Sequence, residues 1–355
     1  MRKKVHFLLL VMSVSFIVPA FGQTESKQGD KYTLLTMPYI NRPLNTYRGQ
    51  LQVNAGYRFA VRSRSFDADG KKIVLKDDGN SSVLHYYFTE VKYGLTSFME
   101  IGGEFYYMKR GIRDETISYI STDNAYTVNN LKEYKGPGDL FLYTALRLPF
   151  EYKWFDFGIS GGIFLPTAGY KPDQPSHSIT AESVNAYTIN YHFNNKNGFG
   201  VPVYMISAAA KFTFSRLAFE AGFSIRDPLK EGTNIRWDQE LTMLNTFAYE
   251  NKPYMYLPDR TMLANASIHY QPVGWFNIYL GGNYTTMQDG WTEYYGLKYR
   301  NPEMHLFSLE PGFEIQISPT LILYQVAGIP LAGRNADASI NFFTSLRFNM
   351  FLFRK

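Results

Sequence analysis

The chain has 355 residues, no cysteine and a formal charge of +5, three units of which belong to the basic residues at positions 2–4. The absence of cysteine excludes a disulfide scaffold, a thiolate metal site and lipid attachment through an N-terminal cysteine. A nucleic-acid binder needs a concentrated basic face, and the charge of +2 that remains beyond residue 4 argues against one.

The aromatic content narrows the class of protein further. Tyrosine and phenylalanine number 28 each, aromatic residues make up 17% of the chain, and the mean hydropathy is −0.25. A helical membrane protein would contain apolar runs of about 18 residues or more, and none follows the first 22 residues. A transmembrane β-barrel reconciles many aromatic residues with a polar average, because one face of each strand meets lipid, the other meets a polar lumen, and aromatic girdles lie at both interfaces.

The first 22 residues are predicted to be a secretory signal peptide. Three basic residues precede an apolar run, Phe7–Val18, and Ala20-Phe21-Gly22 offers small residues at the cleavage positions. We expect the mature chain to begin at Gln23. An uncleaved anchor helix is the alternative, and it is less favoured because the run is too short to cross a bilayer and is broken by Pro19.

Residues 23–48 precede the first predicted strand and show little alternation. Pro38 and Pro43 disfavour a strand within a ladder. A disordered periplasmic tail and a segment folded into the lumen both fit this composition. A few apolar residues that a free tail would not need favour a segment that tucks into or against the periplasmic end and restricts the pore; they are Met37, Tyr39, Ile40 and Leu44.

From residue 49 onward the sequence alternates with a period of two, which indicates strands with one apolar and one polar face. In residues 49–64 the apolar face holds Leu51, Val53, Ala55, Tyr57, Phe59 and Val61. Residues 217–226 and 276–285 repeat the pattern. Residues 83–95 and 321–329 are ambiguous, because apolar residues occupy both faces. If Glu90 and Lys92 face the lumen, Tyr86 and Phe88 face it too.

The connections alternate between short and long, as in outer-membrane barrels with short periplasmic turns and long extracellular loops. This arrangement predicts, over residues 49–355, a single antiparallel up-and-down transmembrane β-barrel of about twelve strands, with ten or fourteen as alternatives and both termini in the periplasm. The long connections are expected at 65–81, 109–137, 166–200, 227–259, 288–301 and 330–337. The strands are expected at 49–64, 82–95, 98–108, 138–149, 155–165, 201–214, 217–226, 260–270, 276–287, 302–317, 321–329 and 338–353.

An outer-membrane hydrolase would need a nucleophile and a general base within hydrogen-bond reach. Ser176-His177-Ser178 lies in a long predicted loop, where a histidine is usually solvated. Ser267 and His269 share the polar face of one strand, but no partner carboxylate is specified, and a polar pair facing the lumen is the simpler interpretation. We therefore predict that the chain is not an enzyme.

Metal ligation and cofactor binding are not expected either. The acidic residues of two long loops lack ligand spacing, and solvated loop charges are favoured over a calcium site at the rim; they are Asp227, Asp238, Glu240, Asp289 and Glu293. The aromatic residues of the long loops have two interpretations, a rim that catches ligand or, more commonly, girdle and loop packing. They are Tyr119, Tyr126, Tyr134, Tyr187, Tyr191, Tyr249, Tyr254, Tyr256 and Trp291.

The polar faces of the strands carry charges of both signs. A charge that faced lipid near the bilayer midplane would cost about 2–4 kcal/mol, so these residues are predicted to line the lumen. Two interpretations stay open: a selectivity lining, and a packed interior of salt bridges. The residues are Arg58, Arg62, Glu100, Glu104, Asp139, Arg147, Lys211, Glu220, Arg226, His269, Glu310, Glu314 and Arg347.

Several stretches resemble known outer-membrane proteins. The aromatic last strand, Phe348–Phe353, resembles the C-terminal signal by which the barrel-assembly machinery recognises its clients, although Arg354 and Lys355 follow here where many clients end on the aromatic residue. Four further stretches, in this order across most of residues 49–355, resemble the family named for the MetA pathway of phenol degradation, a branch of the FadL-like transporter and porin barrels. They are Tyr93-Gly94-Leu95-Thr96 leading to Glu100-Ile101-Gly102, Gly136-Pro137-Gly138-Asp139-Leu140, Leu165-Pro166-Thr167-Ala168-Gly169 and Pro330-Leu331-Ala332-Gly333-Arg334-Asn335.

The resemblance implies passage of small molecules, with hydrophobic ones among the candidates, across the outer membrane of a Gram-negative bacterium. We expect passive or ligand-gated transport, because no energy-coupling feature appears in the sequence. The alternatives are a structural or surface-binding barrel with a closed lumen and, less favoured, a membrane-embedded lipid hydrolase. The expected partners are membrane lipid, lipopolysaccharide, the barrel-assembly machinery and a small-molecule substrate, with no nucleic acid.

Overall fold

The computed structural model describes residues 44–74, 82–121, 124–148, 154–168, 198–241, 247–294 and 297–352. Every regular element in these ranges is a β-strand. Among these residues no helix has the length and apolar character needed to cross a bilayer. The predicted signal peptide and residues 23–43 lie outside the described residues.

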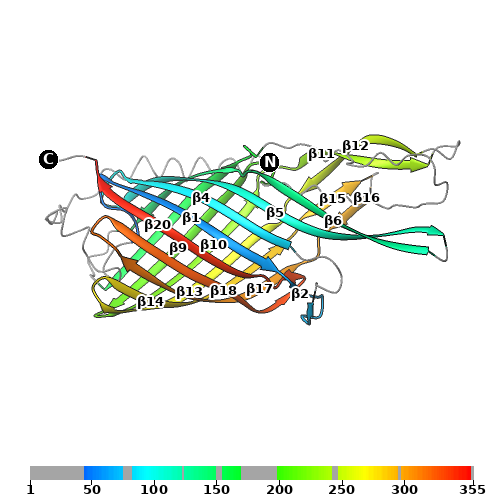
Figure 1. Ribbon diagram of the computed structural model, residues 1–355. Coiled ribbons are helices and arrows are strands. Elements are labelled where there is room, and N and C mark those ends of the chain that lie inside the picture. Colours follow the sequence, from blue (N-terminus) through cyan, green and yellow to red (C-terminus); the bar gives the residue numbers. More distant parts are fainter. Residues whose placement is uncertain are drawn as a thin grey trace.

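Twelve antiparallel strands close into a barrel (Figure 1). Each pairs with its neighbour along the chain, and the ring closes where the first strand pairs with the last, from Gln50 opposite Phe351 to Val61 opposite Ile340. The predicted fold and strand number are therefore confirmed. The strands are β1 Gln50–Arg62, β4 Ser82–Gly94, β5 Met99–Ser121, β7 Leu140–Arg147, β8 Phe155–Leu165, β9 Val203–Phe214, β10 Leu217–Pro228, β13 Arg260–Val273, β14 Phe276–Gln288, β17 Met304–Gln316, β18 Leu321–Arg334 and β20 Ile340–Phe351.

The two ends of the barrel differ. Short turns lie at the end nearer the C-terminus, here called the turn end, and long hairpins project from the opposite, hairpin end (Figure 1). The expected long loops contain strands that alternation did not predict, because ladders can continue beyond the membrane without an apolar face. Strand β5 extends to residue 121 and pairs with β6, outside the barrel ring. These additional strands are β2 Arg64–Phe66, β3 Lys72–Val74, β6 Asn124–Pro137, β11 Gly232–Leu241, β12 Phe247–Leu257, β15 Trp291–Tyr294, β16 Leu297–Arg300 and β19 Ala336–Asp337.

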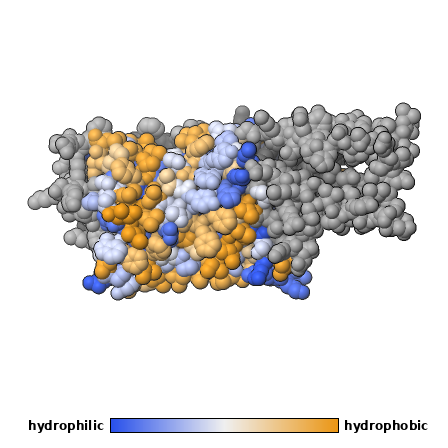
Figure 2. Space-filling view, viewed as in Figure 1, coloured by the Kyte–Doolittle hydropathy of each residue, from blue (hydrophilic) through white to orange (hydrophobic). Residues whose placement is uncertain are grey.

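The outer surface of the barrel is apolar. Phe219 and Phe223 of β10 are 41% and 46% exposed, whereas Ala218, on the opposite face of the same strand, is 0% exposed. Figure 2 shows apolar residues over much of the strand surface on one side of the molecule. A contiguous apolar surface of this extent is unfavourable in water and suits a lipid environment. The chain therefore has the fold and the outer surface of an outer-membrane protein.

The structure shows which residues of β4 face the lumen, a point that the sequence left ambiguous. Tyr87 and Val91 are exposed on the outer surface, and Tyr86, Phe88 and Glu90 line a cavity inside the barrel. Aromatic residues occupy both faces of β4 because the outer ones meet the membrane and the inner ones pack against the lumen walls. The second ambiguous strand, β18, has the same character at the position of Tyr324, whose ring stacks on that of Tyr279 with 5.5 Å between the centroids.

Candidate functional site: a cavity in the barrel lumen

A cavity of about 690 Å³ lies within the barrel, against strands β1, β4, β5, β7, β8, β9, β10 and β20. Its side chains combine rings with charges, which distinguishes it from a simple water-filled pore. The aromatic lining residues are Tyr86, Phe88, Tyr106, Phe141, Tyr143, Phe164, Phe199 and Phe343, and the charged ones are Arg58, Glu90, Lys92, Glu100, Glu104 and Arg226.

The rings form stacked pairs along the wall. The centroids of Phe141 and Phe164 are 4.3 Å apart, and those of Tyr86 and Tyr106 are 5.0 Å apart. The sequence makes room for these rings with glycine. A Cβ added at Gly138 would overlap the ring of Tyr106, so no other residue fits there without moving the ring. The Gly136-Pro137-Gly138 stretch thus shapes the wall of the cavity.

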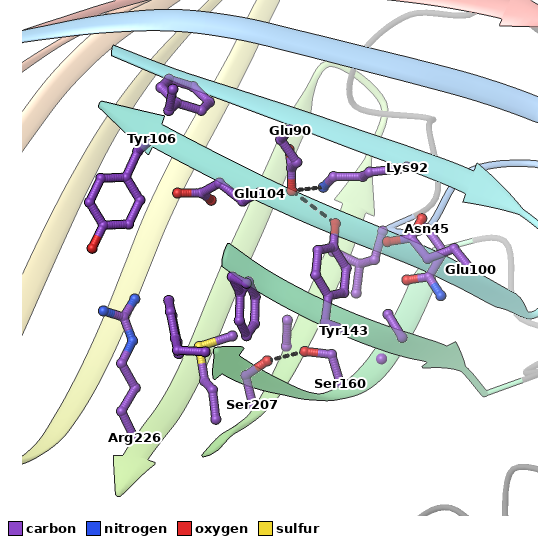
Figure 3. Close-up of a pocket in the computed structure, with 18 of the residues that line it drawn as sticks. Asn45, Glu90, Lys92, Glu100, Glu104, Tyr106, Tyr143, Ser160, Ser207 and Arg226 are labelled. Carbon is purple, nitrogen blue, oxygen red and sulfur yellow. Dashed lines mark hydrogen bonds and ion pairs between the residues drawn. The ribbon is translucent and has the colours of Figure 1, made fainter. Parts of the chain in front are cut away.

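The three carboxylates of the cavity all accept hydrogen bonds. Glu90 accepts one from the hydroxyl of Tyr143 at 2.9 Å, and the ammonium of Lys92 lies 3.1 Å from the same oxygen (Figure 3). The hydroxyl of Tyr86 donates to Glu104 at 2.9 Å. Glu100 is satisfied by the chain that precedes β1, as described next. The negative charges of the cavity are therefore stabilised by the protein itself.

A short segment, residues 44–48, crosses the inside of the turn end. The backbone N–H of Thr46 donates to Glu100 at 2.6 Å, and its hydroxyl donates to the same oxygen at 2.9 Å. The N–H of Leu44 donates to Asp156 at 2.8 Å. Leu44 and Asn45 form part of the cavity lining. We call residues 44–48 the strap; it forms the floor of the cavity on the side of the turn end.

Glycine allows the strap to approach the wall. A Cβ at Gly94, the last residue of β4, would overlap the carbonyl oxygen of Tyr47. The N–H of Gly49 donates to the carbonyl oxygen of Gly94 at 2.7 Å, which joins the end of the strap to this strand. The Tyr93-Gly94-Leu95-Thr96 stretch is therefore needed for a backbone contact, in addition to its place at a turn.

The cations of the cavity fall into two groups. Lys92 pairs with Glu90. Arg58 and Arg226 make no hydrogen bond or ion pair within the described part of the chain. Their guanidinium groups instead face rings: that of Arg58 lies 5.5 Å from the centroid of Phe343, and that of Arg226 lies 5.2 Å from the centroid of Phe164. Figure 3 shows Arg226 pointing into the cavity toward Tyr106.

The predicted lumen residues divide between this cavity and the rest of the interior. Four of them line the cavity: Arg58, Glu100, Glu104 and Arg226. Arg147 pairs with Asp156 at 2.6 Å beside the strap, and Arg62 pairs with Asp337 at 2.7 Å near the hairpin end. Glu310 accepts a hydrogen bond of 3.4 Å from Asn283, and Arg347 lies 3.9 Å from Glu314.

A polar cluster joins strands β9, β10, β13 and β14. Lys211 lies 3.0 Å from Glu220, and the Nε2 atom of His269 lies 3.7 Å from the other oxygen of Glu220. Ser267 contacts the same Nε2 atom at 2.9 Å, and Asn277 contacts Nδ1 at 3.3 Å. This network is closely packed: Lys211 and His269 are 4% exposed, and the imidazole stacks on Tyr279.

Asp139, also predicted to face the lumen, is not part of the cavity lining. It is fully buried between β6 and β7, before the first residue of β7. Its carboxylate accepts hydrogen bonds from the backbone N–H of Phe199 at 2.6 Å and of Ala168 at 3.1 Å. The residue thus joins the two ends of the connection between β8 and β9 at the hairpin end. It has the phase of the cavity residues Phe141 and Tyr143 of β7, but its carboxylate is covered by this connection.

Several candidate residues of the loops have structural partners or lie outside the described residues. Asp227 lies 3.3 Å from Arg260, which also contacts Asp289. Within the described ranges no cluster of three or more potential metal ligands occurs. Tyr256 donates to the carbonyl of Phe199, and Trp291 lies 3.6 Å beneath the ammonium of Lys298. The structure does not describe the side chains of Tyr119, Tyr126, Tyr134, His177, Tyr187, Tyr191, Asp238, Glu240, Tyr249 and Tyr254.

Sequence reasoning missed part of the cavity wall. Tyr106 and Tyr143 were not predicted to line the lumen, and Glu90 and Lys92 were considered only as a condition for the phase of β4. Alternation could have found the tyrosines, since Tyr106 shares a face of β5 with Glu104, and Tyr143 shares one of β7 with Arg147. Phe199 precedes β9, and no periodic signal marks it.

The comparisons with known proteins support the fold. No protein-family model matches the chain, and no curated protein matches it. Among solved structures, the chain is similar to the COG4313 outer membrane channel from Pseudomonas putida F1, with a TM-score of 0.59, 12% sequence identity, and coverage of 86% of this chain and 97% of that one. A deletion mutant of TodX, a monoaromatic hydrocarbon channel, matches with a TM-score of 0.49, 8% identity, and coverage of 90% of this chain and 95% of that one.

Proposed function

We propose that this barrel is an outer-membrane channel for passive or ligand-gated passage of small, in part hydrophobic molecules. The observation that carries the proposal is the cavity of about 690 Å³ inside the lumen, lined by aromatic and charged side chains. Its volume lies in the range of small-molecule sites, about 300–1,000 Å³. A barrel that served only to display its hairpins would gain nothing from an open space beside unpaired arginines. The structural likeness to an outer membrane channel agrees with this function.

Membership of the MetA-pathway group is a further part of the proposal. Two of the stretches that resemble this family have physical roles in the cavity: Gly138 makes room for the ring of Tyr106, and Gly94 for the strap. A third stretch contributes Ala168, whose N–H donates to Asp139. These roles explain why a channel would need those residues at those places.

The strap and the residues before it are proposed to restrict the turn end of the channel. The support is the pair of carboxylate contacts that hold Thr46 and Leu44 against the wall, together with the position of Leu44 and Asn45 at the cavity. Deletion of residues 23–45 should then raise single-channel conductance and solute uptake. Unchanged permeability in a correctly assembled deletion variant would show that the segment does not restrict passage.

A barrel with a closed lumen is the second candidate, and one observation favours it. Part of the interior between β9 and β18 is occupied by an ion pair and by stacked tyrosines. A hydrolase is less favoured, although Ser267 and His269 are in contact, because the nearest carboxylate, Glu220, is already paired with Lys211. Release of fatty acid from phospholipid vesicles by the purified protein, abolished in Ser267→Ala, would overturn this preference.

The direct test of transport is conductance. The full-length protein, purified from outer membranes in detergent and inserted into a planar bilayer, should produce discrete single-channel steps. Liposomes that contain it should swell in isosmotic solutions of small solutes faster than empty liposomes. Heat-modifiable migration on a gel establishes assembly in each sample, because a closed barrel resists unfolding until heated. An assembled barrel that gives neither conductance nor swelling would contradict the channel function.

A further inference from the structure

The unpaired arginines of the cavity point to a specific class of ligand. Elsewhere in the described interior, cations have acidic partners: Lys211 has Glu220, and Arg147 has Asp156. Arg58 and Arg226 are different, since neither forms a hydrogen bond or ion pair with any residue that the structure describes. Both guanidinium groups border the same cavity.

The carboxylates of the cavity, unlike the two arginines, already have hydrogen-bond partners in the protein and offer no comparable site for a cationic ligand. Glu90 and Glu104 accept hydrogen bonds from tyrosine hydroxyls, and Glu100 accepts two from Thr46. A cationic ligand would have to displace donors that the protein already supplies. An anion would meet guanidinium donors that have no acceptor, and a carboxylate can take two of them from one arginine.

The aromatic side chains beside these arginines favour a ligand that contains an aromatic ring. Arg226 lies over Phe164, which stacks on Phe141, and Arg58 lies between Phe343 and Tyr86, with its guanidinium 6.0 Å from the centroid of the tyrosine. Flat aromatic surfaces favour an aromatic guest in stacked or edge-to-face contact. A ring with one carboxylate therefore meets both features of the cavity together.

We propose that the cavity binds small aromatic carboxylates, with the ring among these aromatic side chains and the carboxylate on the guanidinium of Arg226, while Arg58 supplies a second positive charge. The inference deepens the proposed channel function and rests on it, because it names the class of molecule that passes. Arg226 lies close to the hairpin end of β10, and the strap lies at the opposite end. The anion would thus be captured first and would meet the strap afterwards.

Binding of benzoate to the detergent-solubilised full-length protein, measured by calorimetry, tests the site separately from transport. Two comparison compounds separate the contributions of the ring and of the charge of benzoate. Benzamide keeps the ring without the charge, and acetate keeps the charge without the ring. Benzoate should bind at least about tenfold more tightly than either compound, given the strength of hydrogen bonds between charged partners. Arg226→Met should remove the preference for benzoate over benzamide, and Arg58→Met should reduce it by less.

The matched control is Arg62→Met. Arg62 lies on the same face of β1 as Arg58, loses the same charge, and is paired with Asp337 outside the cavity. It should leave benzoate binding unchanged. Arg226→Lys, which keeps the charge, should retain part of the preference and shows that a loss in the methionine variant is not a folding defect.

The outcomes separate the ligand class from the channel function. Equal binding of benzoate and benzamide by a barrel that conducts in a bilayer would overturn the aromatic carboxylate and leave the channel intact. Equal losses in Arg62→Met and Arg226→Met would also overturn it, because a general loss of positive charge would then explain the effect. Selective binding of benzoate by a barrel that does not conduct would support the site and contradict transport.

Discussion

Two halves of the lumen use the same inward-facing pattern in opposite ways. Around β4 to β8, rings and glycines leave the cavity, into which β1 and β10 place two arginines that have no ion pair with any described residue. In the other half, here called the filled half, inward residues of β9, β10, β14 and β18 pack against one another: Lys211 pairs with Glu220, and Tyr279 stacks on Tyr324. A polar inner face therefore does not by itself make a pore. Whether the lumen stays open depends on whether each charge pairs with a residue of a neighbouring strand and on whether the side chains fill the barrel.

The largest effect is expected in the filled half. Lys211→Met leaves Glu220 beside His269 without its cation, and removal of one partner from a buried pair costs about 3–5 kcal/mol. Because Glu220 retains some exposure, we expect the lower end of that range. The temperature at which the heat-modifiable band shifts should fall clearly. Lys298→Met, at an exposed position of β16, should shift it little, and an equal shift in both variants would contradict a packed ion-pair network.

A smaller loss of stability is expected when a methyl group is added to the wall of the cavity. In Gly138→Ala the new methyl group meets the ring of Tyr106, and overpacking of this kind typically costs about 1–3 kcal/mol. The ring can relieve the clash only by moving into the cavity, so benzoate binding should weaken as well. If binding and thermal stability both match the parent protein, Tyr106 does not form the wall as described.

Loosening the strap should cost less again. Thr46→Val removes the hydroxyl that donates to Glu100 but keeps the backbone donor. The loss of one such hydrogen bond costs about 1–3 kcal/mol, and we expect the lower end of that range because the backbone N–H still donates to the carboxylate. The strap would open more often, so conductance should rise in steps that switch between two levels. Thr46→Ser, which keeps the hydroxyl, is the control. A steady conductance equal to that of the parent in both variants would show that Glu100 does not hold the strap over the passage.

The smallest change in stability is expected where the charge has no partner. Arg226→Met removes a cation that makes no ion pair within the described chain, so unfolding in detergent should change by about 1 kcal/mol or less, the contribution of its cation–π contact with Phe164. A small change in stability in Arg226→Met and a large one in Lys211→Met would show that charges in the two halves differ in their structural role. A loss as large as that of Lys211→Met would mean that Arg226 is a structural residue.

The strand bounds were predictable because lipid penalises every polar residue placed on the outer face, which enforces alternation inside the membrane. Beyond the hairpin end that constraint disappears, and the extension of β5 to residue 121 and its pairing with β6 were not foreseen.

Part of the charge pairing could also be predicted from the sequence. The two-residue turn at Ser215 and Arg216 fixes the register between β9 and β10, and this register places Lys211 opposite Glu220 and Met205 opposite Arg226. The unpaired state of Arg226 on that side could therefore be read from the turn. Arg58 is different, because a long connection leaves the register of β1 and β4 open, and its contact with Phe343 exists only once the barrel has closed.

The reversal potential of single channels in a salt gradient tests the central claim most directly, because it reports which half of the lumen carries the passage. Arg226→Glu changes a cavity charge that has no ion pair among the described residues, and Arg347→Glu makes the same charge change at a residue that lies beside Glu314 and is not part of the cavity lining. Arg226→Glu should shift selectivity strongly toward cations in an assembled barrel, whereas Arg347→Glu should lower thermal stability and shift selectivity little. Equal shifts in the two variants, or a larger one in Arg347→Glu, would contradict a passage through the aromatic cavity.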